Sequence, residues 1–210
     1  MLGLLMDGGW MMLPLLLCSI LGLAVIIDRM RAFKAAGEDY EGLRKTVRGK
    51  LEEGDVMAAL EAAGGAKGPV AATFVTGLNR FVRQMGKGKA ADEAATAAVR
   101  SMEEYAPKAL KPLEVRLNLL VLVAAIAPLL GMTGTVTGMI SSFDVMASSA
   151  GLDPGAVAGG IGEALITTAA GLIVAMPCAG CYNLFTLKID DITSTIDAGL
   201  TDMMETVGEA

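Results

Sequence analysis

Glu163 is the residue whose position most clearly suggests chemistry. It lies in GGIGEALITTAAGL, within a stretch from Leu117 to Leu187 that has no Lys or Arg and only two other acids. A carboxylate inside an apolar membrane segment costs roughly 3 kcal/mol to insert and usually marks a functional site. Alternatively, Glu163 lies at the outer interface of a span that begins at Ala164, because enough apolar residues remain up to Phe185.

Hydroxyl-bearing residues accompany this carboxylate. Thr167 lies one helical turn after Glu163 on the same face, and Thr168 lies beside it. The preceding apolar run carries three more threonines interleaved with glycines: Thr133, Thr135 and Thr137 with Gly131, Gly134 and Gly138. Two such helices without a basic residue would form a narrow, cation-selective lining that holds water and passes protons. Alternatively, the small residues only allow close helix packing and each Thr bonds its own helix.

Several other kinds of chemistry are disfavoured by the residue inventory. The chain has no His, which excludes Ser-His-Asp and Cys-His nucleophiles and His-ligated metals. Cys178 and Cys181 form a single Cys-x-x-Cys pair, which lacks two of the four ligands that structural zinc needs. No Gly-rich stretch ends in Gly-Lys-Ser/Thr, and the net charge of -6 argues against nucleic acid. We therefore expect no enzyme, no bound cofactor and no nucleic-acid partner.

Three apolar runs must position these residues. Hydrophobic residues make up 53% of the 210-residue chain and charged residues only 19%, below the ~25% typical of soluble domains. The runs cover residues 8–27, 117–140 and 157–185, each long enough for a transmembrane helix. The first run has no basic segment before it, so we interpret it as a span rather than a signal peptide. The predicted fold class is an all-α, three-span integral membrane protein in a lipid bilayer.

The charge distribution predicts the topology. Sixteen of the 17 basic residues lie between Asp28 and Arg116, the other being Lys188. By the positive-inside rule, residues 28–116 are cytoplasmic. Residues 1–7 and the 141–156 loop, rich in Ser, Gly and Asp, then lie on the outer side of the membrane, and the 186–210 tail is cytoplasmic. Trp10 fits an interfacial anchor at the outer end of the first span.

The predicted cytoplasmic segment is helical throughout. Apolar residues at three- and four-residue spacing, from Tyr40 to Leu51, indicate an amphipathic helix, followed by a Gly54-Asp55 turn and a short helix that stops at Gly64-Gly65. Another helix begins at Pro69 and ends near Met85. A long Ala-rich helix from Asp92 is expected to run straight into the second span. We expect little core of its own here, and helices that extend the membrane helices and pack against other copies of the chain.

Both long apolar motifs resemble those of the MotA/TolQ/ExbB proton-channel family. APLLGMTGTVTGMISSF (127–143) resembles the family's AP-x-x-G-L-x-G-T-V-x-G pattern, and GGIGEALITTAAGLIVAMPCAGCYN (159–183) resembles its G-I-x-E-A-L-x-x-T-A-x-G-L pattern. IDRMRAF and EEGDVMAALEAA resemble shorter family motifs. Three spans with a short outer N-terminus are similar to the TolQ/ExbB branch. In departure from the pattern, Thr137 replaces a common Trp, and Thr133 and Thr167 add hydroxyls.

The resemblance implies roles for matching residues. Thr135 and Thr168 are expected to face a pore, with Glu163 at the family's acidic position and Thr167 beside it. The expected helix-shaping residues are Pro128, Gly131, Gly134, Gly138, Pro177 and Asn183.

The same resemblance implies a function. The chain would be a subunit of a bacterial inner-membrane motor, with its outer segments in the periplasm. Five copies would form a ring around two copies of a single-span ExbD/TolR-like partner. The transported ion would be H⁺, and a TonB/TolA-like transducer would carry the work onward. Small-residue faces on the last two spans independently favour a homo-oligomer. A passive cation channel and a structural oligomeric scaffold remain the alternatives.

Overall fold

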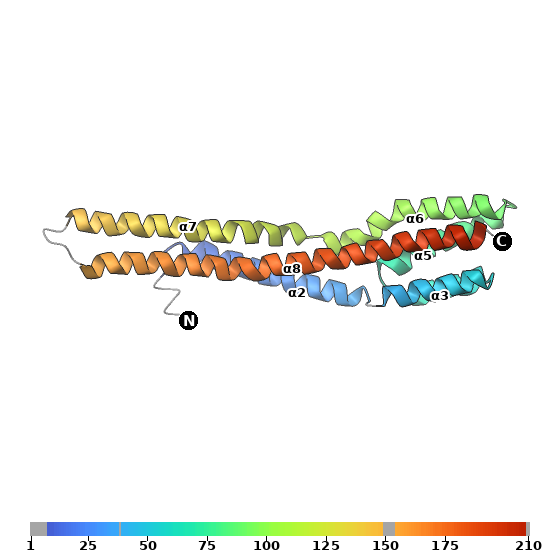
Figure 1. Cartoon of the computed structure of the whole chain (residues 1–210), viewed down its shortest axis with the longest axis horizontal. Coiled ribbons are helices and arrows are strands. Elements are labelled where there is room, and N and C mark those ends of the chain that lie inside the picture. Colours follow the sequence, from blue (N-terminus) through green and yellow to red (C-terminus); the bar gives the residue numbers. More distant parts are fainter. Residues whose placement is uncertain (1–7, 38, 149–153, 209–210) are drawn as a thin grey trace. The chain divides into compact units, whose positions relative to one another are not determined.

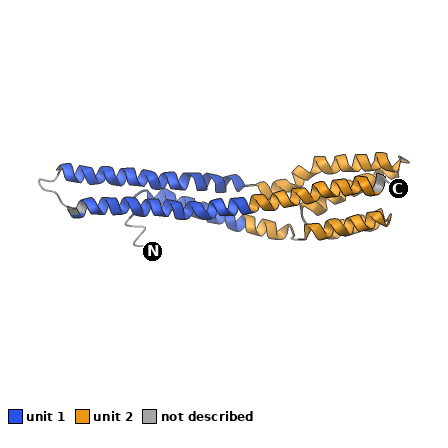
Figure 2. Ribbon diagram, in the orientation of Figure 1, with its two compact units in different colours: residues 1–28, 116–184 blue, residues 29–115, 185–210 orange. Residues whose placement is uncertain are grey.

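The computed structural model describes residues 8–37, 39–148 and 154–208. Every regular element in these residues is an α-helix, which confirms the predicted all-α class (Figure 1). In chain order the helices are α2 (Met12–Ala35), α3 (Tyr40–Glu52), α4 (Val56–Gly65), α5 (Pro69–Met85), α6 (Ala91–Glu114), α7 (Leu117–Ser148) and α8 (Pro154–Gly208). Two compact units divide the chain (Figure 2): unit 1 contains residues 1–28 and 116–184, and unit 2 contains residues 29–115 and 185–210.

In the described part of the chain, three helices, α2, α7 and α8, are long and apolar enough to cross a membrane, and they match the three predicted spans. In unit 1 they carry large apolar side chains that point outward. Leu17, Leu129 and Ile173, one from each helix, are 59–65% exposed. An apolar surface of this extent on a single chain is typical of contact with lipid or with other subunits.

The helices do not begin and end where the predicted spans do. Helix α2 begins at Met12 rather than at Gly8 and continues past the predicted end to Ala35. The expected 141–156 loop is wrong in extent, because α7 continues to Ser148 and α8 already begins at Pro154. The polar composition of this stretch suggested a loop, but Ser142 is buried and its hydroxyl donates to the Gly138 carbonyl of its own helix. Residues 1–7, predicted to be periplasmic, lie outside the described residues.

The expected continuous helix from Asp92 into the second span is also wrong. Helix α6 ends at Glu114 and α7 begins at Leu117, with Arg116 between them at φ +68°, the one positive φ outside glycine in the described residues. Within unit 2, the buried Arg29 side chain donates to the carbonyls of Pro112 and Leu113 at 2.7 and 3.3 Å. These last-turn carbonyls have no helical N–H partner when a helix stops, so Arg29 caps the end of α6.

Unit 2 has a core of its own, contrary to our expectation. Phe74 and Leu78 of α5 and Met102 of α6 are at most 2% exposed. Glycines make the close approach possible, because a Cβ at Gly77 would lie 2.3 Å from the Met102 sulfur and one at Gly199 would lie 2.4 Å from the Phe74 ring. The last part of α8, predicted only as a tail, meets this core at Gly199 and carries four further buried side chains: Ile189, Ile192, Ile196 and Met203.

Local sequence explains most helix starts in unit 2. Asp39 and Asp55 act as N-caps, since their carboxylates accept hydrogen bonds from the amides of Gly42 and Ala58 at 2.8 and 2.9 Å. Pro69 occupies the first turn of α5, where no amide donor is required. Gly68 before it has φ +103°, and a Cβ there would lie 2.0 Å from the Ala36 carbonyl oxygen. The chain therefore passes close against the end of α2 at a position that only glycine can occupy.

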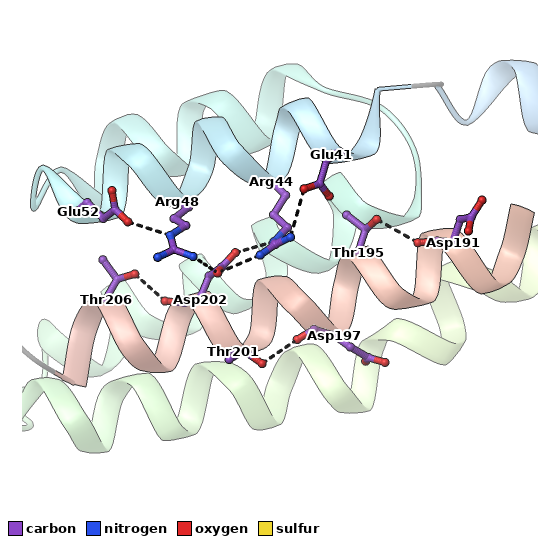
Figure 3. A network of polar contacts seen from close by, with 10 residues as sticks. All are labelled: Glu41, Arg44, Arg48, Glu52, Asp191, Thr195, Asp197, Thr201, Asp202 and Thr206. Carbon is purple, nitrogen blue, oxygen red and sulfur yellow. Dashed lines mark hydrogen bonds and ion pairs between the residues drawn. The ribbon is translucent and has the colours of Figure 1, made fainter.

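A buried carboxylate ties the last part of α8 to α3 (Figure 3). Asp202 is 4% exposed and accepts from Arg44 through Nε at 2.6 Å and Nη2 at 3.2 Å, and from Arg48 through Nη1 at 2.8 Å. The hydrogen bond to Asp202 raises the pKa of Arg44 above its ordinary value. Arg48 also pairs with Glu52 one turn along α3. Both carboxylate oxygens of Asp202 are thus satisfied by charge-assisted bonds, which are the stronger kind.

Candidate functional site

The candidate site lies in unit 1, where α7 and α8 pack backbone against backbone. A Cβ added at Gly131 would lie 3.0 Å from the Cα of Thr168, and one at Gly138 would lie 2.9 Å from the carbonyl oxygen of Gly160. A Cβ at Gly171 would lie 2.5 Å from the carbonyl oxygen of Ala127. Small residues at helical spacing allow this approach. We call this contact the glycine seam; its members are Gly131, Gly134, Gly138, Gly160 and Gly171.

Two threonines of α8 form bonds beyond their own helix at this seam. The Thr168 hydroxyl donates across it to the Gly131 carbonyl at 3.0 Å, and also lies 3.2 Å from the Ala164 carbonyl. The Thr167 hydroxyl donates to the Gly8 carbonyl at 2.8 Å and lies 2.8 Å from the Glu163 carbonyl. The methyl group of Thr167 occupies the space that a side chain at Gly134 would need, 2.5 Å from the position of its Cβ.

Thr135 lies in a different environment from Thr167. It is half-buried, and its hydroxyl donates to the Met132 carbonyl of its own helix at 2.6 Å. It opens onto a groove of about 210 Å³ between α7 and α8, whose other lining residues are Met139, Ser142, Phe143, Val157, Ile161, Ala164 and Leu165. Thr133 and Thr137 also bond carbonyls of α7, as Thr residues in apolar helices commonly do.

Glu163 is half-buried in α8, and its carboxylate lies against the backbone that precedes α2. A Cβ at Gly9 would lie 1.7 Å from Oε1 of Glu163 and 2.8 Å from its Cδ. The same turn contains Gly8, the acceptor of the Thr167 hydroxyl. The structure therefore brings Glu163, Thr167 and the Gly8-Gly9 turn together, and it places Thr168 one step along the seam at Gly131. Sequence reasoning missed Gly8, Gly9 and Gly160, because we assigned Gly8-Gly9 to the first span.

The residues expected to shape the helices sit within continuous helix. Helix α7 continues through the half-buried Pro128, and α8 continues through the exposed Pro177 and Asn183. Their shaping role stays a prediction. Cys178 is buried with its sulfur beside Gly22, 2.6 Å from where a Cβ would lie, so it packs α8 against α2. Within the described ranges, no group of three or more Cys, Asp or Glu side chains is placed to hold a metal ion.

Comparison with known proteins adds the family. Residues 66–198, which include most of α5–α8, match the MotA/TolQ/ExbB proton channel family. The chain is 31% identical to the Tol-Pal system protein TolQ of Haemophilus influenzae over 185 residues, which cover 83% of this chain and 77% of that one. TolQ of Pseudomonas aeruginosa is 29% identical over 181 residues, 84% of this chain and 77% of the relative.

A shorter and stronger match involves a second type of relative. The biopolymer transport protein exbB1 of Vibrio cholerae is 44% identical over 75 residues, 35% of this chain and a third (33%) of that protein's length. The family match covers more than half of the chain and includes Glu163, both threonine clusters and the glycine seam. This chain is therefore a member of the MotA/TolQ/ExbB proton channel family.

Proposed function

We propose that this chain is the ring-forming subunit of a motor in the bacterial inner membrane that is driven by the proton-motive force. Five copies would surround a single-span partner of the ExbD/TolR type, and H⁺ flow would move ring and partner relative to each other. The observation that carries the proposal is Glu163, a half-buried carboxylate against Gly9 and one turn from Thr167 in a member of a proton-channel family. The partner would pass work on to a TonB/TolA-like transducer.

The chemistry of the site is compatible with proton transfer. A hydroxyl that donates to a carbonyl keeps lone pairs that can accept a hydrogen bond from water. Thr135 and Thr168 both have this arrangement, on the two helices of the seam. Residues 117–187 contain no basic side chain, so nothing in the helices themselves would repel a cation. One proton that falls through 100 mV releases about 2.3 kcal/mol, enough over several protons to rearrange helix contacts.

Proton uptake by vesicles tests the proposal. Proteoliposomes with an imposed proton gradient and an internal pH-sensitive dye would hold either this chain alone or the chain with a co-purified ExbD/TolR-like partner. We expect negligible flux from the chain alone and clear flux with the partner, lost in Glu163→Gln. Conduction by the chain alone would instead indicate a passive cation channel. No conduction in either preparation would indicate a structural scaffold.

A further inference from the structure

The Gly8-Gly9 turn lies against the carboxylate of Glu163, and nothing in the proposed function assigns this turn a role. Gly8 is buried, and its carbonyl oxygen lies 2.8 Å from the Thr167 hydroxyl, which shares its proton between Gly8 and the equally distant Glu163 carbonyl of its own helix. Thr167 itself is 1% exposed. The hydrogen bond is thus shielded from water, and it joins residues that are 159 positions apart in the chain. It fixes the backbone before α2 against α8, one turn away from Glu163.

The contact requires glycine for two independent reasons. Gly9 has φ +67°, a conformation that residues with a Cβ rarely adopt. A Cβ at Gly9 would also overlap the Glu163 carboxylate, at 1.7 Å from Oε1. Gly88 (φ +75°) and Gly54 (φ +76°) differ in the second respect, since a Cβ at either would meet nothing within 4 Å. Backbone therefore lies directly on the carboxylate, in a space that no side chain shares.

We propose that the Gly8-Gly9 turn is a closure over the proton-carrying carboxylate, held shut by the Thr167 hydroxyl. Glu163 exchanges a proton on this side only when the turn lifts and water reaches Oε1. Thr167 is then a positioning residue: it holds the turn and does not itself carry the proton. This inference rests on the proposed function for its purpose, but the closure can be tested without any proton flux.

Carbodiimide labelling measures access to the carboxylate. N,N′-dicyclohexylcarbodiimide reacts with protonated carboxyl groups in apolar surroundings, and mass spectrometry of the peptide that contains Glu163 gives the rate. In the purified full-length chain we expect slow labelling. Thr167→Val keeps the side-chain volume and removes the bond to Gly8, so labelling should accelerate about fivefold, the factor that corresponds to about 1 kcal/mol for one hydrogen bond. Thr167→Ser restores the hydroxyl and should return the rate to that of the unmodified chain.

Glycine variants provide a matched second measurement. Gly9→Ala should displace the carboxylate and accelerate labelling, whereas Gly88→Ala has the same strained φ without a neighbour and should leave the rate unchanged. Glu163→Gln, which cannot form the adduct, identifies the labelled peptide. If Gly9→Ala does not fold, the comparison of Thr167→Val with Thr167→Ser still tests the closure. Equal labelling rates in the unmodified chain, Thr167→Val and Thr167→Ser would overturn the closure.

Proton flux then separates the closure from the motor. With the partner present, Thr167→Val should increase the proton leak when the gradient does no work, and Thr167→Ser should not. Altered labelling with no flux in any preparation would retain the closure and reject the proposed function. Normal partner-dependent flux together with unaltered labelling would retain the proposed function and reject the closure.

Discussion

At the scale of single residues, the structure distinguishes threonines that look equivalent in the sequence. Thr168 donates across the seam to Gly131, and Thr167 donates to Gly8, whereas Thr135 bonds only a carbonyl of its own helix. Helices that are apolar all round carry no periodicity that reveals which face meets a neighbour. The chain positions of these hydroxyls could therefore be predicted from the sequence, but their partners could not.

Replacement of Thr135 and Thr168 by Val tests their expected place in the proton path. Val keeps the shape of Thr and removes the hydroxyl, so partner-dependent flux should fall in both variants. Stability should differ between them. Thr168→Val loses an interhelical bond worth about 1 kcal/mol, and Thr135→Val loses only a bond within α7, which is nearly neutral. Thermal unfolding in detergent measures the difference in stability, and vesicle flux measures the loss of proton transport.

Full gradient-driven flux in Thr135→Val and Thr168→Val, with normal assembly with the partner, would contradict this prediction. The two hydroxyls would then not be part of the proton path. The matching Ser variants serve as controls, because they retain a hydroxyl at each position.

At the scale of elements, the helices with polar ends and one apolar face were predictable and the contacts between them were not. Capping residues Asp55 and Pro69 and the spacing of Val47 and Leu51 predicted α3, α4 and α5 closely. The end of α6 before Arg116 could not be predicted from the sequence, because a positive φ in a residue other than glycine has no sequence signature. The core of unit 2 was missed because its close contacts, such as Gly199 on Phe74, join distant parts of the chain.

The attachment of α8 to α3 through the Asp202 carboxylate is expected to contribute to stability. Asp202→Asn keeps the size of the side chain and removes the charge that faces Arg44 and Arg48. Because both arginines are partly exposed, with 23% and 43% of their side-chain surface accessible, water screens part of the loss, and we expect unfolding to become easier by about 1–2 kcal/mol. Thermal unfolding, followed by loss of helical circular dichroism, should show a melting temperature lower by a few degrees.

A surface ion pair provides the matched control. Arg100 and Glu104 are 80% and 67% exposed, so Glu104→Gln should leave the melting temperature unchanged. An Asp202→Asn variant as stable as this control would show that the buried carboxylate does not hold α8 in place.

At the scale of the whole molecule, the number of spans followed from apolar length alone, and the topology remains a prediction from charge. The positive-inside rule assigns residues 28–116, with 16 of the 17 basic side chains, to the cytoplasm. The proton path is directional, so its proposed sense depends on this orientation.

Cysteine labelling in intact cells checks the orientation. After replacement of Cys18, Cys178 and Cys181 by Ser, a cysteine introduced at Ser148 should react with a membrane-impermeant maleimide added outside. A cysteine introduced at Lys87, in the turn between α5 and α6, should react only after the membrane is permeabilised. The opposite pattern would reverse the topology and the direction assigned to the proton path.

The glycine seam also limits how the molecule can move. The Thr167 methyl fills the notch at Gly134, and the Thr168 hydroxyl reaches one particular carbonyl, that of Gly131. A slide of α7 along α8 by one residue, about 1.5 Å, would push the methyl out of its notch and leave the hydroxyl without that carbonyl. Such a slide would break both contacts at once, so we expect α7 and α8 to move together, with any relative movement of helices located outside this pair.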